Sequence, residues 1–172
     1  LDGQIDIYLP DYKYYSSYYA GLYSHAQDYR DFAVPAIDEM VRQTGAPQFD
    51  ENGMLTRGTV IRHLMLPGLG GDTSQILRDI AVRWGNRVLV SLMRQYTPFD
   101  MDEYPELDRT ITAEEYETAC GEFRELGLGG FDVHIVVDGV QVVIVPDRAD
   151  MLLLDLHLVP LFTAVADHDG SG

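Results

Sequence analysis

The sequence predicts an α/β fold built from parallel β/α units, on three observations. Short apolar or alternating runs are interleaved with longer segments of helical periodicity, in the order strand, helix, strand, helix, strand, helix. The run Arg87–Met93 is almost entirely apolar, as in parallel strands that are covered on both faces. Turn residues close the segments, at Pro10, Gly45, Pro67-Gly68 and Gly127. Because three strands alone leave a sheet edge exposed, we expect this unit to need a partner.

The first strand is expected at Gln4–Leu9, where polar and apolar residues alternate up to Pro10. A connection rich in tyrosine follows. Ser24 and Gln27 have the spacing of a capping box, which predicts a helix from there to Gly45. Pro35 indicates a break or restart within that helix.

The second strand is expected at Thr59–Leu66, and Asp72 is the expected N-cap of the helix after it. The buried face of that helix should carry five apolar side chains, those of Ile76, Leu77, Ile80, Ala81 and Trp84. The third strand leads into a loop, Thr97–Thr110. The spacing of Thr112 and Glu115 predicts a capping box for the last helix, which should run to Leu126 and stop at Gly127.

The chain is divided into residues 1–130, which hold the β/α units, and a tail of different character, residues 131–172. Asp138-Gly139 separates two apolar runs and predicts an antiparallel hairpin over Val133–Val145. We expect this hairpin to cover part of the exposed sheet edge, and the polar end Asp167–Gly172 to be frayed.

Composition excludes several classes of function. The formal net charge is -16, and so acidic a surface repels phosphate backbones, so nucleic acid is not an expected partner. No stretch reaches the roughly 18 apolar residues of a membrane span. The start shows no signal peptide and no initiator Met, so we expect a cytoplasmic protein that begins inside a longer reading frame. Cys120 is the only cysteine, which excludes an internal disulfide and a multi-cysteine metal site.

Polar residues that follow the strands are the candidate binding residues, because function in parallel β/α folds gathers at the C-terminal strand ends. Asp11 and Lys13 form a D-x-K pattern, which is either a solvated ion pair or a cation that binds a carboxylate or ribose hydroxyl. Arg62, inside an apolar strand, needs either a neighbouring carboxylate or a ligand. His63 should face the opposite side of that strand as a packed or surface imidazole.

Other candidates carry weaker signals. Gln95 and Tyr96 are expected to line the same mouth as Lys13 and Arg62, with loop packing as the alternative for Tyr96. The glycine-rich segment 68–71 matches neither the dinucleotide nor the P-loop pattern, and is better interpreted as a turn than as an anion site. The histidines lack metal-ligand spacing, and Cys120 is expected to be a buried, inert thiol. We therefore expect no catalytic or metal-binding residue on this chain.

Several sequence segments between Gln4 and Gly130 are similar to segments of one known family and occur in the same order. They are Asp6–Tyr14, Ala36–Gln43, Arg57–Gly68, Ser91–Pro98, Tyr104–Leu107 and Thr112–Leu128. In these segments the chain resembles the C-terminal half of radical S-adenosylmethionine proteins of the pyruvate formate-lyase activating enzyme group.

The resemblance implies half of a β/α (TIM-type) barrel that holds S-adenosylmethionine against a [4Fe–4S] cluster and generates a 5′-deoxyadenosyl radical by reductive cleavage, an oxidoreductase or lyase chemistry. It places Asp11 and Lys13 near the methionine and ribose of the cofactor. It makes Arg62 the strand arginine that reaches the cofactor, and Gln95 and Tyr96 part of the pocket.

The chain departs from the family in two respects. The three-cysteine cluster motif is absent, so the cluster belongs to the full-length family and is not expected on this chain, which should be inactive alone. After Phe131 the family's ending is replaced by the hairpin, either as a genuine variant or as an out-of-frame readout. The expected partners are the missing N-terminal barrel half or another subunit, and a glycyl radical enzyme. The alternative is a non-enzymatic acidic β/α binding or subunit module.

Overall fold

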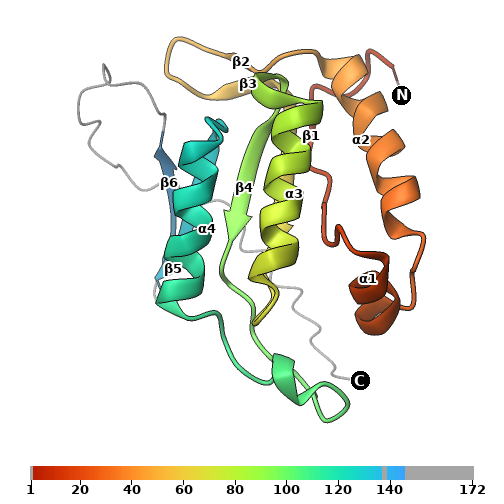
Figure 1. Cartoon of the computed structure of the whole chain (residues 1–172). Helices are drawn as coiled ribbons and strands as arrows, with labels where there is room; N and C mark the ends of the chain where they lie inside the picture. Colours follow the sequence, from red (N-terminus) through yellow and green to blue (C-terminus); the bar gives the residue numbers. More distant parts are fainter. Residues whose placement is uncertain (1, 137–138, 146–172) are drawn as a thin grey trace, which may run out of the picture.

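The structure, a computed structural model, describes residues 2–136 and 139–145 (Figure 1). Within these residues the helices are α1 Ser17–Ser24, α2 Tyr29–Thr44, α3 Gly70–Arg83 and α4 Ala113–Glu125, with 3-10 turns η1 Gly85–Arg87 and η2 Pro105–Leu107. The strands are β1 Ile7–Tyr8, β2 Gln48–Phe49, β3 Leu55–Leu64, β4 Leu89–Met93, β5 Gly130–Val136 and β6 Gly139–Val145. None of the described helices is long and apolar enough to cross a bilayer.

The strands form one open, partly parallel sheet in the order β1-β3-β4-β5-β6, and β2 pairs with β3 at the side. The pairs β1–β3, β3–β4 and β4–β5 are parallel, whereas β2 is antiparallel to β3. The C-terminal ends of β3 and β4 therefore point to the same edge, the lower one in Figure 1, where α1 and η2 also lie. This agrees with the predicted α/β class, while α1 and β2 are elements that the predicted order of strands and helices did not contain.

The strands β5 and β6 pair antiparallel, with Val136 opposite Gly139 and Gly130 opposite Val145. The predicted turn includes Asp138, which lies outside the described residues, as does the predicted frayed end. The division of the chain at residue 131 stays a prediction.

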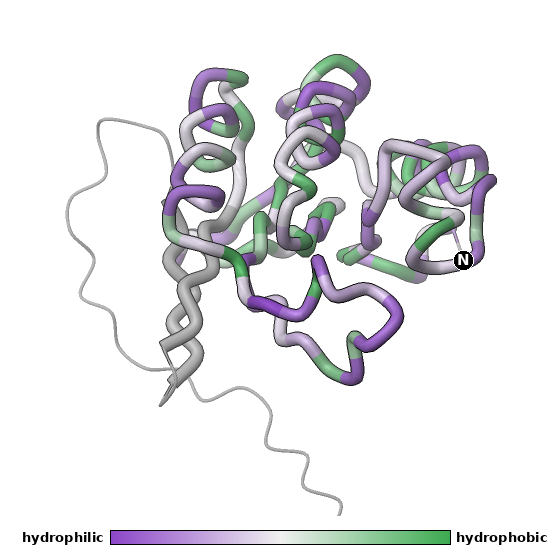
Figure 2. The backbone as a smooth tube through the Cα atoms, turned by 60° about the horizontal axis from the view of Figure 1, so that its bottom comes forward, coloured by the Kyte–Doolittle hydropathy of each residue, from purple (hydrophilic) through white to green (hydrophobic). Residues whose placement is uncertain are grey.

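Helices cover one face of the sheet. Alternate residues of β3 and of the segment that follows it, Ile61, His63 and Met65, are buried, and the main core packs Ile61 against α2 and α3. A second cluster joins Met65 to α4. Figure 2 shows the described helices on one side of the strands. We call the opposite side the helix-free face.

The helix-free face is defined by strand register. Arg62 lies opposite Ser91, and Leu64 lies opposite Met93, so these residues share a face. Asp11 forms an isolated parallel bridge with Arg62, which adds it to the same side.

The helix predicted to end at Gly45 is present as α2, but it begins at Tyr29, and the predicted capping box of Ser24 and Gln27 does not start it. The connection itself contains α1, whose N-cap Ser16 accepts a hydrogen bond from the Tyr18 amide. The second helix, α2, begins at Tyr29 and continues through Pro35 without a break. Val34 and Ile37, before and after Pro35, are both buried in the main core.

Asp72 is not the N-cap of α3. The helix begins two residues earlier, at Gly70, with Leu69 at the N-cap position. Asp72 instead accepts hydrogen bonds from the amides of Tyr15 and Ser16, both at 2.9 Å. The predicted capping box of Thr112 and Glu115 is present, and Gly127 follows α4 with φ 63°.

Candidate functional site

Asp11 lies between two cations at the C-terminal ends of β1 and β3. Its Oδ1 is 2.7 Å from Arg62 Nη2, and its Oδ2 is 3.8 Å from Lys13 Nζ. The side chains of Lys13 and Arg62 are 54% and 43% exposed, so both remain accessible to a ligand. The D-x-K pattern and the strand arginine thus form one cluster, in which Asp11 is the carboxylate that Arg62 was expected to need.

Backbone hydrogen bonds to Arg62 of β3 hold the chain in place immediately before and immediately after Asp11. The Arg62 amide donates to the Pro10 carbonyl at 2.8 Å, and the Tyr12 amide donates to the Arg62 carbonyl at 2.9 Å. Tyr29 of α2 adds a bridge, because its hydroxyl donates to the Asp11 carbonyl at 2.7 Å and accepts from the Lys13 amide at 3.0 Å. The backbone of the D-x-K segment is therefore held in place while the Asp11 and Lys13 side chains remain partly exposed.

The middle residue of the pattern, Tyr12, anchors the segment in the core. It is fully buried, and its ring makes an edge contact with Trp84. Its hydroxyl donates to Asp79 at 2.7 Å and accepts from Arg30 at 3.0 Å, while Arg30 also binds both oxygens of Asp79 at 3.0 Å. This network links the D-x-K segment to α2 and α3.

The network also sets the charge of Asp79. Burial raises its pKa, but hydrogen bonds from Tyr12, Arg30 and Arg83 lower it more, so the pKa of Asp79 is below its usual value. Burial raises the pKa of the Tyr12 hydroxyl, and the hydrogen bond to Asp79 raises it further. Tyr12 is therefore the donor and Asp79 the ionised acceptor.

His63 lies on the opposite side of β3 from Arg62, as predicted, and is a packed imidazole. Its Nδ1 is 2.8 Å from the Tyr12 carbonyl, and its Nε2 is 3.0 Å from Thr73 Oγ1. Burial lowers the pKa of His63, so the ring is neutral. A neutral ring that donates from Nδ1 accepts at Nε2, which assigns Thr73 as the donor.

The cluster can bind a ligand that carries both charges. Lys13 is the only lysine in the sequence. Its ammonium and the Arg62 guanidinium can donate to a carboxylate or hydroxyl, while Asp11 can accept from an ammonium or hydroxyl.

Tyr96 does not join this cluster. It lines a cavity of about 580 Å³ at the same edge of the sheet, together with Tyr14, the neighbour of Lys13, and Leu66, which follows β3. Gln95 is exposed and outside the cavity lining, with its amide nitrogen 3.6 Å from Met93 Sδ. The single pocket that we expected around Lys13, Arg62, Gln95 and Tyr96 is therefore divided in the structure. The charged cluster of Asp11, Lys13 and Arg62 is one region, and the cavity lined by Tyr96 is another.

Sequence reasoning missed the aromatic wall of the cavity. Tyr14, Tyr23 and Tyr104 line it, although the first two were assigned to a connection and the third to a loop. The signal was the density of tyrosine between residues 12 and 23.

Two further expectations concern the glycine-rich segment and the thiol. The Gly68 amide donates to Glu115 at 2.9 Å, which favours the turn interpretation of this segment. Cys120 is buried, as expected. No three His, Cys, Asp or Glu side chains within the described ranges are placed to hold a metal ion.

The chain is 31% identical over 121 residues to an uncharacterized protein of Methanocaldococcus jannaschii, and the match covers 69% of this chain and 31% of that protein. The chain thus spans about a third of the length of the relative. No family model and no solved structure matches.

Proposed function

We propose that this chain is the S-adenosylmethionine-side part of a radical S-adenosylmethionine protein similar to the pyruvate formate-lyase activating enzyme. In this proposal Asp11, Lys13 and Arg62 bind the methionine end of the cofactor. The observation that carries it is the position of these three charges, on the helix-free face at the C-terminal ends of two parallel strands.

The charges match the ligand. The methionine end of S-adenosylmethionine carries one ammonium and one carboxylate. Asp11 can accept from the ammonium, while Lys13 and Arg62 can donate to the carboxylate, each as a charge-assisted hydrogen bond. Bound there, the cofactor supplies radical chemistry when an electron reaches it. This chain's own part is to hold and orient it.

An iron–sulfur cluster does not fit the residues of this chain. A [4Fe–4S] cluster of this family needs three thiolates, and the sequence has one cysteine, Cys120, buried on α4. In our proposal the cluster is therefore supplied by another part of the protein or another subunit, and the chain alone does not cleave the cofactor.

The finer architecture, half of a β/α barrel, belongs to the same proposal. Two features support it: parallel strands with helices on one side, and a helix-free face that combines apolar Leu64 and Met93 with the charged cluster. In a β/α barrel the helices form the outer ring and such a face lines the interior. The antiparallel β5–β6 pair then continues the sheet at its edge. A glycyl radical enzyme is the target that the family resemblance suggests.

Calorimetric titration with S-adenosylhomocysteine, which keeps the amino and carboxyl groups but is not cleaved, tests the proposal. Arg62→Gln removes one cation of the cluster. Arg78→Gln is the matched control, because Arg78 also pairs with a carboxylate at 2.7 Å, that of Glu122, but on the helical side.

We expect the wild-type chain to bind S-adenosylhomocysteine. Arg62→Gln should weaken this binding about tenfold or more, in line with about 1.5–3 kcal/mol for a hydrogen bond to a charged group. Arg78→Gln should leave the affinity unchanged. Absence of binding by the wild type, or equal effects of both variants, would contradict the proposal. Either result would favour a non-enzymatic binding module.

A further inference from the structure

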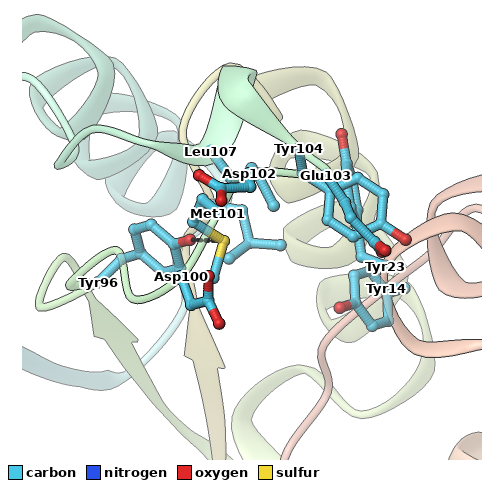
Figure 3. A pocket seen from close by; sticks show the side chains of 10 residues that line it. Tyr14, Tyr23, Tyr96, Asp100, Met101, Asp102, Glu103, Tyr104 and Leu107 are labelled. Carbon is cyan, nitrogen blue, oxygen red and sulfur yellow. Dashed lines mark hydrogen bonds between the residues drawn. The ribbon is translucent and has the colours of Figure 1, made fainter.

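A second binding region is formed by the cavity of about 580 Å³ between α1 and the loop that joins β4 to α4. Its lining contains four tyrosines, which are Tyr14, Tyr23, Tyr96 and Tyr104. Figure 3 shows Tyr96, Asp100 and Met101 on one side of it, and Tyr14, Tyr23 and Tyr104 on the other. The residues of the proposed cofactor cluster are not part of this lining.

The tyrosine hydroxyls have partners within the protein. Tyr23 donates to Glu106 at 2.9 Å, Tyr104 donates to the Leu22 carbonyl at 2.9 Å, and Tyr14 is 2.9 Å from Ser24 Oγ. The Tyr96 hydroxyl is 3.3 Å from Met101 Sδ. Because the hydroxyls are engaged, these side chains offer a ligand the parts of their rings that line the cavity, the least from Tyr14, which is buried.

The same contacts hold the cavity walls together. Tyr23 of α1 and Tyr104 of the loop pack edge to face with ring centroids 5.2 Å apart. With the Tyr23–Glu106 hydrogen bond, this contact joins two segments that are more than 80 residues apart in the sequence. The aromatic wall of the cavity is therefore preformed in the absence of a ligand.

The remaining polar lining is entirely acidic. Asp100, Asp102 and Glu103 line the cavity, are exposed, and form no ion pair with the described residues. No Lys or Arg lines it. The nearby Arg109 is held by Glu115 at 2.7 Å. The cavity thus concentrates negative potential.

The combination of aromatic rings and carboxylates in the cavity lining indicates which type of cation can bind there. A small metal ion needs several oxygens at one point, and no three carboxylates of the described residues converge in that way. Aromatic rings with dispersed negative charge instead favour a large, weakly hydrated cation.

We propose that this cavity binds an organic cation, a quaternary ammonium or a guanidinium group. The inference does not rest on the proposed cofactor, since it uses different residues.

The test is a titration followed by calorimetry or by amide chemical shifts, with choline and its neutral isostere 3,3-dimethylbutan-1-ol, and with arginine amide as the guanidinium probe. We expect choline or arginine amide to bind about tenfold more tightly than the isostere, as cation–π attraction and the carboxylates act only on a charge. Amide shifts should move at Tyr23, Tyr96 and Tyr104.

Two triple variants distinguish the effect of the cavity carboxylates on cation binding from the effect of the overall net charge. One carries Asp100→Asn, Asp102→Asn and Glu103→Gln in the cavity, and the other carries Glu51→Gln, Glu117→Gln and Glu125→Gln at exposed remote positions, so the net charge changes equally. The cavity triple should weaken the tighter cation at least tenfold, and the remote triple and Arg62→Gln should not. If cations and isostere bind alike, if neither cation binds, or if both triples weaken binding equally, the proposal is overturned.

Discussion

Asp11, which follows β1, meets Arg62 of β3 with Oδ1 and Nη2 2.7 Å apart, at a position where the two backbones are also bridged. The hydrogen bonds from the Arg62 amide to Pro10 and from the Tyr12 amide to Arg62 fix this register. The pairing of charges on the helix-free face is thus set by the strand pairing, and Tyr12, between Asp11 and Lys13, anchors it in the core.

Tyr29 is predicted to position the D-x-K segment. Tyr29→Phe removes the hydroxyl that bridges the Asp11 carbonyl and the Lys13 amide. We expect the free energy of unfolding to fall by about 1–2 kcal/mol, the net value of two hydrogen bonds. Ligand binding by Lys13 should weaken as well, because its backbone is no longer held.

Urea denaturation measures the first effect, and titration with S-adenosylhomocysteine the second. Tyr18→Phe is the control, since Tyr18 is 67% exposed and its hydroxyl makes no hydrogen bond with the described residues. A loss of stability as large in Tyr18→Phe would show that the Tyr29 bridge has no special role.

Asp79→Asn should destabilise the chain at neutral pH by about 2–3 kcal/mol, because it removes the carboxylate that pairs with Arg30 and accepts from Tyr12. Since the pKa of Asp79 is lowered in the folded state, its stabilisation is present above the unfolded pKa of about 3.9 and is lost as the pH falls toward the folded value.

The difference in unfolding free energy between wild type and Asp79→Asn should therefore shrink below about pH 4. Urea denaturation from pH 7 to pH 3 measures it, with Glu117→Gln as an exposed control on α4. A difference that stays constant with pH would mean that the charge of Asp79 does not stabilise the fold.

His63 should make stability depend on pH in a second window. Its folded pKa is lowered by burial, so below the unfolded value of about 6.5 the unfolded chain binds a proton that the folded chain does not. Stability should thus fall as the pH is lowered from 6.5, by up to about 1.4 kcal/mol per pH unit from this group.

His63→Gln can keep a hydrogen bond to the Tyr12 carbonyl but cannot titrate. Unfolding curves at pH 7, 6 and 5 should show a smaller slope of stability against pH in this variant than in the wild type. Parallel slopes would refute a buried neutral imidazole at this position.

Local signals predicted the elements that depend on local chemistry. Thr112 and Glu115 form the predicted capping box because its two hydrogen bonds close within one turn. Asp72 has equally good capping chemistry, but its carboxylate binds the amides of Tyr15 and Ser16, more than 50 residues away. No local pattern reveals such a tertiary contact.

The candidate site shows the same limit. Asp11, Lys13 and Arg62 could be predicted together because parallel strands end at a common edge. The cavity could not, because Tyr23 and Tyr104 meet through a loop whose path the sequence does not specify. Tyr96 belongs to that cavity, while strand order alone had grouped it with Lys13.

Lys13 offers the most direct test of the central proposal, since it is the only lysine in the chain. Reductive ¹³C-methylation keeps its charge and gives one side-chain signal, which is distinct from that of the N-terminal amine. We predict that this signal shifts saturably when S-adenosylmethionine or S-adenosylhomocysteine is added, and that Arg62→Gln weakens the response about tenfold or more. A Lys13 signal that does not move at saturating ligand would contradict the assignment of this cluster to the cofactor.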